Sequence, residues 1–421
     1  MKIRLILAAL LLPLTAFATV DFDYWFADAT LRLDYIFAGS NTKQEISLSE
    51  MSTTEGWAGR RVNMDALLLE GNGQITVTDH QTDKVLYRNS FSTLFQEWQH
   101  TEEAVKVRRA FENTLLVPMP IKPVDITITL VDNHRKITAQ MTHLVNPKDK
   151  NIRKGKVRYP DYVRQIFSNG EPSEKIDIVF VAEGYTKEQM GQFFKDVETA
   201  RRSLFSHAPF DQYENRFNAI AVAIPSEKTD VSVPQDGQWH DTPCKSHFNT
   251  LYSARYLMTE RVFQLHDLLE GLPYEHIIIL ANTHTYGGGG IYNMYMLTTA
   301  RHYEFRPVVV HEFGHSFAGL ADEYFYDDMY ETYYPADTEP WEPNLTTLVN
   351  FDAKWRNMVK DVSKRDTGDV GIYEGGGYQS KGVYRGSYDC RMKTNSYPVF
   401  CPVCQDAIKR VIEYNTVEQT Q

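Results

Sequence analysis

Two histidines four residues apart, His311 and His315, enclose Glu312 in the order His-Glu-x-x-His. On a helix, side chains four positions apart lie on one face, so both imidazoles can reach a single metal ion. Zinc favours such nitrogen ligands, and catalytic zinc sites keep one position open for water. Glu312 is placed to accept a proton from that water, whose pKa the metal lowers to about 7. The pattern predicts hydrolysis by metal-bound water that Glu312 activates.

The residues before this motif favour a functional site over a chance match. Pro307 suits the first turn of a helix, and the apolar run Val308–Val310 continues it with helical periodicity. The two histidines are therefore expected on a helix that follows a buried strand.

A catalytic zinc ion needs a third protein ligand, and the residues after the motif offer two. On a straight helix, residue 322 would lie about 16 Å along the axis from residue 311, which is too far. Gly319 can end the helix in a left-handed conformation and turn the chain back. We favour Asp322 as the third ligand because its short side chain suits a tight turn, and Glu323 is the alternative.

The elements that must position this site begin with a β-rich segment. Within residues 19–145, Gln74–Thr78 alternates with period two and Val85–Tyr87 returns, while Val124–Val131 is answered by Lys136–Met141. One face is apolar and the other is rich in threonine, as a half-buried antiparallel sheet requires. We predict an N-terminal β-sandwich domain over 19–145.

Residues 146–175 have the basic, Gly- and Pro-containing composition of a linker, whose charges we interpret as solvated surface. Residues 176–421 are then predicted to form an α/β catalytic domain, so that the chain as a whole is of the α+β class. In this domain we expect strands at Ile176–Ala182, Phe217–Ile224, Ile277–Ala281 and Ile291–Leu297. We expect helices at Glu188–Phe205 and Leu251–Leu269. The run Gly287–Gly290 has two interpretations, a sheet edge that pairs with an extended peptide or a flexible surface loop.

The first 18 residues have the features of an export signal. Lys2 and Arg4 precede an apolar run from Ile3 to Leu14, and Ala16-Phe17-Ala18 forms a small-x-small cleavage site. We expect residues 1–18 to be removed and the mature chain to be periplasmic, cell-surface or extracellular. No later apolar run has the ~20 residues that a membrane span needs. A net charge of −11 argues against a nucleic-acid partner.

Four cysteines belong to the expected exported chain. Disulfides are the usual state in an oxidising compartment, and the spacing favours a bridge from Cys390 to Cys401 or Cys404, with Cys244 free or joined to the remaining partner. A zinc knuckle at Cys401 and Cys404 is the alternative, but it lacks a fourth ligand close in sequence.

Three further features have weaker signals. Met392 is either a methionine-containing turn beneath the metal or a core residue, and Tyr384 or Tyr388 are candidates for stabilising an oxyanion. An acidic stretch has oxygen ligands suited to calcium but no defined loop spacing, so we interpret it as solvated surface. Its members are Asp327, Asp328, Glu331, Asp337 and Glu339.

Four segments together resemble the IgA-specific zinc metallopeptidase family: Val181–Thr186, Tyr286–Gly290, His311–Tyr324 and Cys390-Arg391-Met392. The resemblance spans nearly the whole mature chain. It implies a β-rich N-terminal domain before a zincin, metzincin-like catalytic domain, with two histidines and an aspartate on zinc that match His311, His315 and Asp322. The glycine after the second histidine stands one position later than the usual metzincin spacing. Immunoglobulin is not implied as the substrate.

The sequence thus predicts a secreted zinc endopeptidase that acts on a protein or peptide. Two other functions compete with it: a surface protein- or glycan-binding protein with an inactive metallopeptidase fold, and a zinc amidase that acts on cell-wall peptides. Intact His311, Glu312 and His315 argue against an inactive fold, because loss of the base is the simplest route to inactivity.

Overall fold

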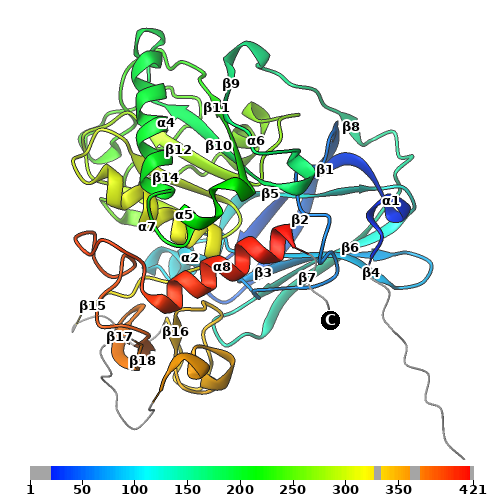
Figure 1. Cartoon of the computed structure of the whole chain (residues 1–421). Helices are drawn as coiled ribbons and strands as arrows, with labels where there is room; N and C mark the ends of the chain where they lie inside the picture. The colour runs from blue at the N-terminus through cyan, green and yellow to red at the C-terminus, as the bar shows by residue number, and fades with distance from the viewer. Residues whose placement is uncertain (1–19, 327–332, 361–369, 418–421) are drawn as a thin grey trace, which may run out of the picture.

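The computed structural model describes residues 20–326, 333–360 and 370–417 (Figure 1). The predicted export signal, residues 1–18, lies outside them. The helices are α1 (Phe22–Trp25), α2 (Leu94–Trp98), α3 (Glu102–Lys106), α4 (Met190–Leu204), α5 (Phe210–Tyr213), α6 (Val262–Leu268), α7 (Phe305–Ala318) and α8 (Pro402–Thr416). The strands are β1 (Phe26–Gly39), β2 (Gln44–Glu55), β3 (Gly73–Asp79), β4 (Val85–Phe91), β5 (Arg109–Pro120), β6 (Val124–Val131), β7 (Ile137–Val145), β8 (Arg153–Lys154), β9 (Val163–Phe167), β10 (Ile176–Glu183), β11 (Phe217–Val222), β12 (His276–Ala281), β13 (Gly288–Ile291), β14 (Tyr295–Thr299), β15 (Phe325–Tyr326), β16 (Leu345–Thr346), β17 (Tyr373–Gly376) and β18 (Tyr378–Arg385).

The N-terminal part contains two four-stranded sheets, ordered β5-β1-β2-β8 and β4-β3-β6-β7. Both predicted hairpins are confirmed, because β3 pairs antiparallel with β4 and β6 with β7. Burial alternates residue by residue along β3 and β6, as the period-two pattern requires. The buried faces of the two sheets meet in one hydrophobic core.

The rest of the chain is built around a six-stranded sheet, ordered β13-β14-β12-β10-β11-β9. Its four inner strands are parallel and both edge strands are antiparallel. Every residue of β10 and β12 is buried, which explains their continuous apolar runs. Strand β9 comes from the segment with linker composition, so this segment also contributes an edge of the sheet.

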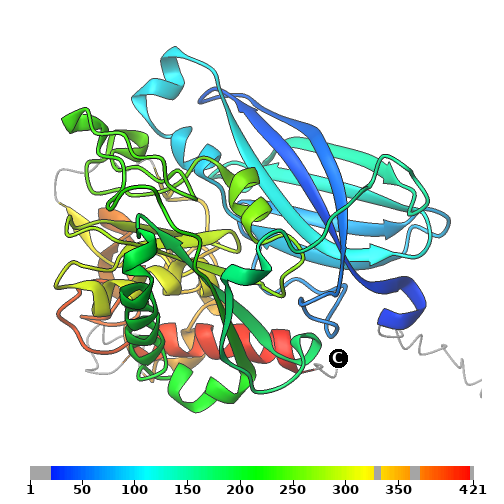
Figure 2. The same ribbon diagram turned by 90° about the horizontal axis from the view of Figure 1, so that it is seen from above.

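The two faces of this sheet have different neighbours. On one face, α4, α7 and α8 pack against Ile178, Phe180 and Ile278. On the other face, Val179, Val181 and Ile279 join the core of the N-terminal sheets. Figure 2 shows the N-terminal strands on the right and the six-stranded sheet with its helices on the left. The N-terminal sheets therefore pack on the face of the six-stranded sheet opposite to α7, the helix that carries the histidine motif.

Two of the predicted elements are wrong. Only Val262–Leu268 of the predicted helix Leu251–Leu269 is α-helical. Leu251 and Tyr252 have positive φ, and the backbone of Tyr256 and Met258 bridges to other segments. The predicted strand Ile291–Leu297 is instead a tight hairpin between β13 and β14, turned at Asn293 with φ of 53°.

No helix in the described ranges is long and apolar enough to cross a bilayer.

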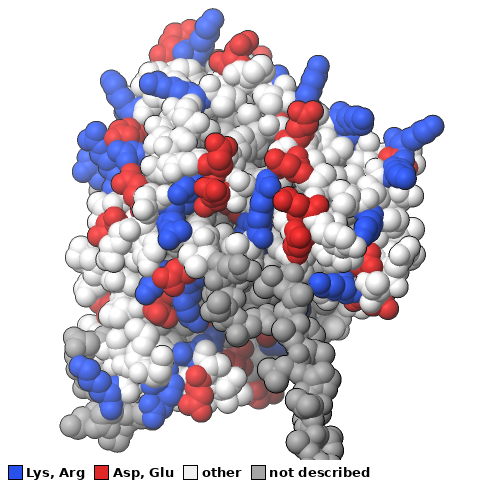
Figure 3. Space-filling model, turned by 45° about the vertical axis from the view of Figure 1, so that its right-hand side comes forward, with Lys and Arg blue, Asp and Glu red and all other residues white. Residues whose placement is uncertain are grey.

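On the face in Figure 3, basic and acidic side chains lie interspersed. Such a mixed surface differs from the basic patch with which a protein binds nucleic acid.

Candidate functional site

Helix α7 carries the His-Glu-x-x-His motif and packs against β13 and β14. It ends at Gly319, which adopts the left-handed conformation with φ of 60°. The Gly319 N–H donates to the carbonyl of His315, and the Leu320 N–H donates to the carbonyl of Gly314. These bonds close the last turn and reverse the chain, as the sequence predicts for this glycine.

This reversal places Asp322 against both histidines. Nε2 of His311 lies 3.1 Å from Nε2 of His315, and Oδ1 of Asp322 lies 3.0 Å and 3.3 Å from these two atoms. Zinc bonds of about 2.0–2.1 Å in tetrahedral geometry separate neighbouring ligand atoms by about 3.3–3.4 Å. Oδ1 of Asp322 is buried and forms no well-directed hydrogen bond within the described part of the chain. The three donor atoms therefore fit a zinc ion that faces all of them.

Backbone and side-chain groups fix the orientation of these three residues. Nδ1 of His311 lies 3.0 Å from the carbonyl oxygen of Arg391, and Nδ1 of His315 lies 2.5 Å from that of Leu320. A carbonyl accepts only from a protonated Nδ1, so each Nε2 is left with a lone pair that can bind a metal. The hydroxyl of Tyr378 donates to Oδ2 of Asp322 over 2.5 Å. This bond leaves Oδ1 to face the histidines.

The charges of the site depend strongly on one another. Burial alone would raise the pKa of Asp322, but the imidazoles of His315 and His311 hold it well below its ordinary value. Burial lowers the pKa of His315, yet the charge of Asp322 outweighs burial and raises it to about 9. Without a metal, His315 and Asp322 therefore hold a proton between them, and a bound cation would displace this proton.

Glu312 lies beside these three residues and faces strand β13. A Cβ placed on Gly288 would lie 3.3 Å from Oε1 of Glu312. Burial raises the pKa of Glu312 against the opposing charges of His311 and His315. A raised pKa makes a carboxylate a stronger proton acceptor, which suits a general base.

Residues 288–290 of the glycine run lie in β13, the outermost strand of the six-stranded sheet, and pairing of this edge with an extended peptide stays a prediction. A Cβ on Gly290 would lie 2.3 Å from the carbonyl oxygen of Glu312 and 3.0 Å from Cβ of His315. Only glycine therefore lets β13 approach α7 this closely.

We expect Gly290→Ala to destabilise the protein by about 1–3 kcal/mol, because the added methyl group must push α7 away from β13. Chemical denaturation monitored by circular dichroism measures this change. The matched control is Gly191→Ala in α4, where a Cβ meets no atom within 4 Å. Its expected effect is neutral or stabilising by up to about 1 kcal/mol. Equal stability of the two variants would contradict the close packing of β13 on α7.

The N-terminal part also reaches the site, through Glu97 of α2. The hydroxyl of Tyr256 donates to Oε2 of Glu97 over 2.5 Å, and the ring of Tyr256 packs against Gly289. Burial raises the pKa of Glu97 to about 7, and the charges of His315, Asp322 and Glu312 act on this carboxyl. The two halves of the chain therefore form the site together, which the sequence pattern does not reveal.

Tyr378 contacts the site through its hydrogen bond to Asp322, and Tyr324 interacts with the same carboxylate, whereas Tyr384 and Tyr388 form no hydrogen bond to His311, His315 or Asp322 in the described part of the chain. Tyr388 is 71% exposed and its ring contacts Tyr373. Tyr378 comes 56 residues after Asp322 and is one of 25 tyrosines, so no local pattern marks it.

Met392 lies beneath α7, because a Cβ on Gly314 would be 2.8 Å from its Sδ atom.

The acidic stretch forms no calcium site in the described residues. Asp337 is exposed, and no candidate metal group includes Asp337 or Glu339. Asp327, Asp328 and Glu331 lie outside the described residues.

The predicted disulfides are not present in the structure, in which all four cysteines are free and buried. Cys244 lies apart from the other three, with its N–H donating to Glu183. Glu323, the alternative third ligand, does not face the histidines: its carboxylate points to Cys401 and Cys404.

Comparison with known families gives two matches. The family described as IgA Peptidase M64 matches residues 165–364 and 361–412, and the domain described as Peptidase M64 N-terminus matches residues 21–142. The first match contains all of the site residues on α7 and the turn after it. No curated protein matches the chain.

Proposed function

The chain belongs to the IgA peptidase M64 family, and from this premise we propose that it is an exported, zinc-dependent endopeptidase. The proposal assigns residues 1–18 to the export signal, 19–145 to a β-sandwich domain, 146–175 to a linker and 176–421 to a zincin catalytic domain. The observation that carries it is the convergence of two Nε2 atoms and one carboxylate oxygen, within 3.3 Å of each other, beside Glu312.

In this proposal His311, His315 and Asp322 hold the zinc ion. When bound, zinc supplies a Lewis acid that polarises the peptide carbonyl and lowers the pKa of water. The Glu312 carboxylate accepts the proton of the attacking water and then donates it to the leaving amine. Tyr378 keeps Asp322 in its orientation through the hydrogen bond to Oδ2.

The substrate we propose is an extended protein or peptide segment, and the name of the family does not make it immunoglobulin. Strand β13 is the edge strand of its sheet, with a bridge from Gly288 to Tyr256 on its outer side, and its glycines lie against Glu312. An edge strand can add a further strand through backbone hydrogen bonds, and glycine allows close approach. A peptide paired with β13 would pass beside the base.

The direct test is cleavage of a mixed, unfolded protein substrate by the purified chain, followed by mass spectrometry of the products. We expect new termini within the proteins, loss of cleavage with a zinc chelator and recovery on adding zinc. Zinc binding without any cleavage would favour the binding protein instead. Cleavage confined to peptidoglycan fragments would favour the amidase.

Tyr378→Phe removes a single hydroxyl and is expected to weaken zinc affinity or activity by about 10- to 100-fold, because Asp322 loses its supporting hydrogen bond. Competition with a chelating dye measures the affinity. The matched control is Tyr388→Phe, which removes the hydroxyl of an exposed tyrosine and should change neither quantity. Unchanged affinity and activity in Tyr378→Phe would show that Asp322 needs no support.

A further inference from the structure

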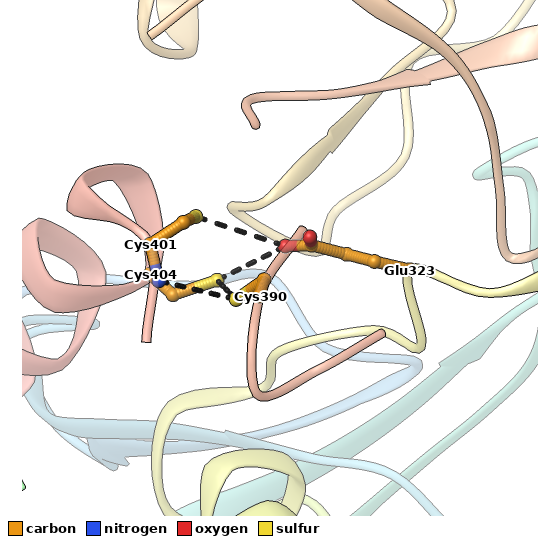
Figure 4. A group of neighbouring side chains, drawn as sticks. All are labelled: Glu323, Cys390, Cys401 and Cys404. Atoms are coloured by element: carbon orange, nitrogen blue, oxygen red, sulfur yellow. Dashed lines mark hydrogen bonds between the residues drawn. The ribbon is translucent and has the colours of Figure 1, made fainter. Parts of the chain in front are cut away.

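A second group of metal-ligating side chains lies outside the histidine site. It consists of Glu323, Cys390, Cys401 and Cys404, whose ligand atoms all lie within 4.8 Å of one another (Figure 4). The four residues are almost entirely buried, with at most 2% exposure. They come from three segments: the turn after α7, the loop that contains Met392, and the start of α8. We call this group the cysteine cluster.

The spacing of its atoms fits a tetrahedral zinc ion. Sγ of Cys390 lies 3.7 Å from Sγ of Cys404, and Oε1 of Glu323 lies 3.1 Å from Cys404 and 3.9 Å from Cys401. Zinc–sulfur bonds of about 2.3 Å separate two sulfurs by about 3.8 Å, and a sulfur from a carboxylate oxygen by about 3.6 Å. The observed separations lie around these values.

The polar groups around the cluster are arranged for charged ligands. Asn344 donates to Oε1 of Glu323 over 3.0 Å, while Oε2 of this fully buried carboxylate has no hydrogen-bond partner in the described ranges. The backbone N–H groups of Met392 and Cys401 both point at Sγ of Cys390, at 3.5 Å and 3.2 Å. A buried carboxylate oxygen without a partner is costly, and a cation beside it removes this cost.

We propose that Glu323, Cys390, Cys401 and Cys404 bind a second, structural zinc ion. Four protein ligands leave no open position for water, which is the arrangement of structural rather than catalytic zinc. The site would join Glu323 to the loop whose Arg391 carbonyl orients His311. Because Glu323 directly follows Asp322, the second zinc holds both of these parts of the first site in place.

The competing state is a disulfide between two of the three clustered cysteines. It would leave Glu323 buried without a metal ion, and one cysteine unpaired. The two states differ in thiol count, since a zinc site keeps all four thiols of the chain reduced and a disulfide removes two of them.

The test uses the full-length protein, purified without chelators, and two measurements on it. Elemental analysis should find two zinc ions per chain, and thiol titration after denaturation with a chelator should find all four thiols. Replacing zinc with cobalt should produce the thiolate-to-cobalt charge-transfer absorption of a cysteine-ligated metal. Two missing thiols without this absorption, or four thiols with no metal in the cluster, would overturn the proposal.

Variants separate this site from the histidine site. His311→Ala should lose one zinc and keep the cobalt–thiolate absorption, whereas Cys404→Ser should lose that absorption. Cys244→Ser is the matched control, because it removes a buried thiol outside the cluster and should leave the spectrum unchanged. Since Cys404→Ser can also unfold the protein, the measurements on the unaltered chain decide the proposal. Failure of the histidine site would reduce the zinc count but leave the cobalt–thiolate absorption.

Discussion

Replacing Glu312 with glutamine is expected to lower kcat by about 10²- to 10⁴-fold, the usual contribution of a general base. Glutamine keeps the size of the side chain beside Gly288 but cannot accept the proton of the attacking water. Glu312 is not one of the three residues whose ligand atoms converge, so its replacement should leave the zinc content of the protein unchanged. Steady-state kinetics on a cleaved peptide and elemental analysis measure the two quantities.

Glu174→Gln is the control for this experiment, because it makes the same chemical change at an exposed position. It should leave kcat unchanged. If Glu312→Gln kept normal activity, another group would act as the base and the proposed mechanism would be wrong. A large fall in zinc content would instead make Glu312 a ligand.

Replacing Asp322 with alanine is expected to lower zinc affinity strongly. The loss should exceed the roughly 10- to 100-fold by which metal affinity falls when a ligand loses a supporting hydrogen bond. The change removes the oxygen that lies 3.0 Å and 3.3 Å from the two imidazoles. It also leaves two histidines as the only protein ligands, so zinc should dissociate during dialysis and cleavage should be lost. Elemental analysis before and after dialysis should show a fall of one zinc per chain.

Tyr378→Phe serves as the comparison, since it acts on the same carboxylate through its other oxygen. The loss of zinc affinity should be larger for Asp322→Ala than for Tyr378→Phe. The reverse order, or full zinc retention in Asp322→Ala, would remove Asp322 from the ligand set.

The parts of the structure that the sequence predicted are those set by local patterns. The apolar runs of β10 and β12 and the alternation in β3 and β6 depend on burial alone, and each element lies where its period places it. The same is true of α7 and of the turn at Gly319, because helix geometry and the left-handed preference of glycine act over a few residues.

The features that the sequence could not predict depend on contacts between distant segments. Residues 251–261 have helical spacing, but bridges such as Tyr256 to Gly288 and His247 to Met258 hold them in an irregular conformation. Tyr378 and Glu97 reach the site from segments far from α7 in sequence.

The cysteines illustrate the same limit. Their spacing favoured a local disulfide, and a zinc knuckle lacked a fourth ligand near in sequence. Glu323 provides that ligand from 81 residues before Cys404, and it can do so only because the chain reverses after Gly319. A pattern search along the sequence has no means of joining these positions.

The most direct test of the account is a crystal structure of the zinc-loaded protein with anomalous diffraction recorded at the zinc absorption edge. We expect an anomalous peak at about 2.0–2.2 Å from Nε2 of His311, Nε2 of His315 and Oδ1 of Asp322. Full zinc loading with no peak between these three atoms would contradict it.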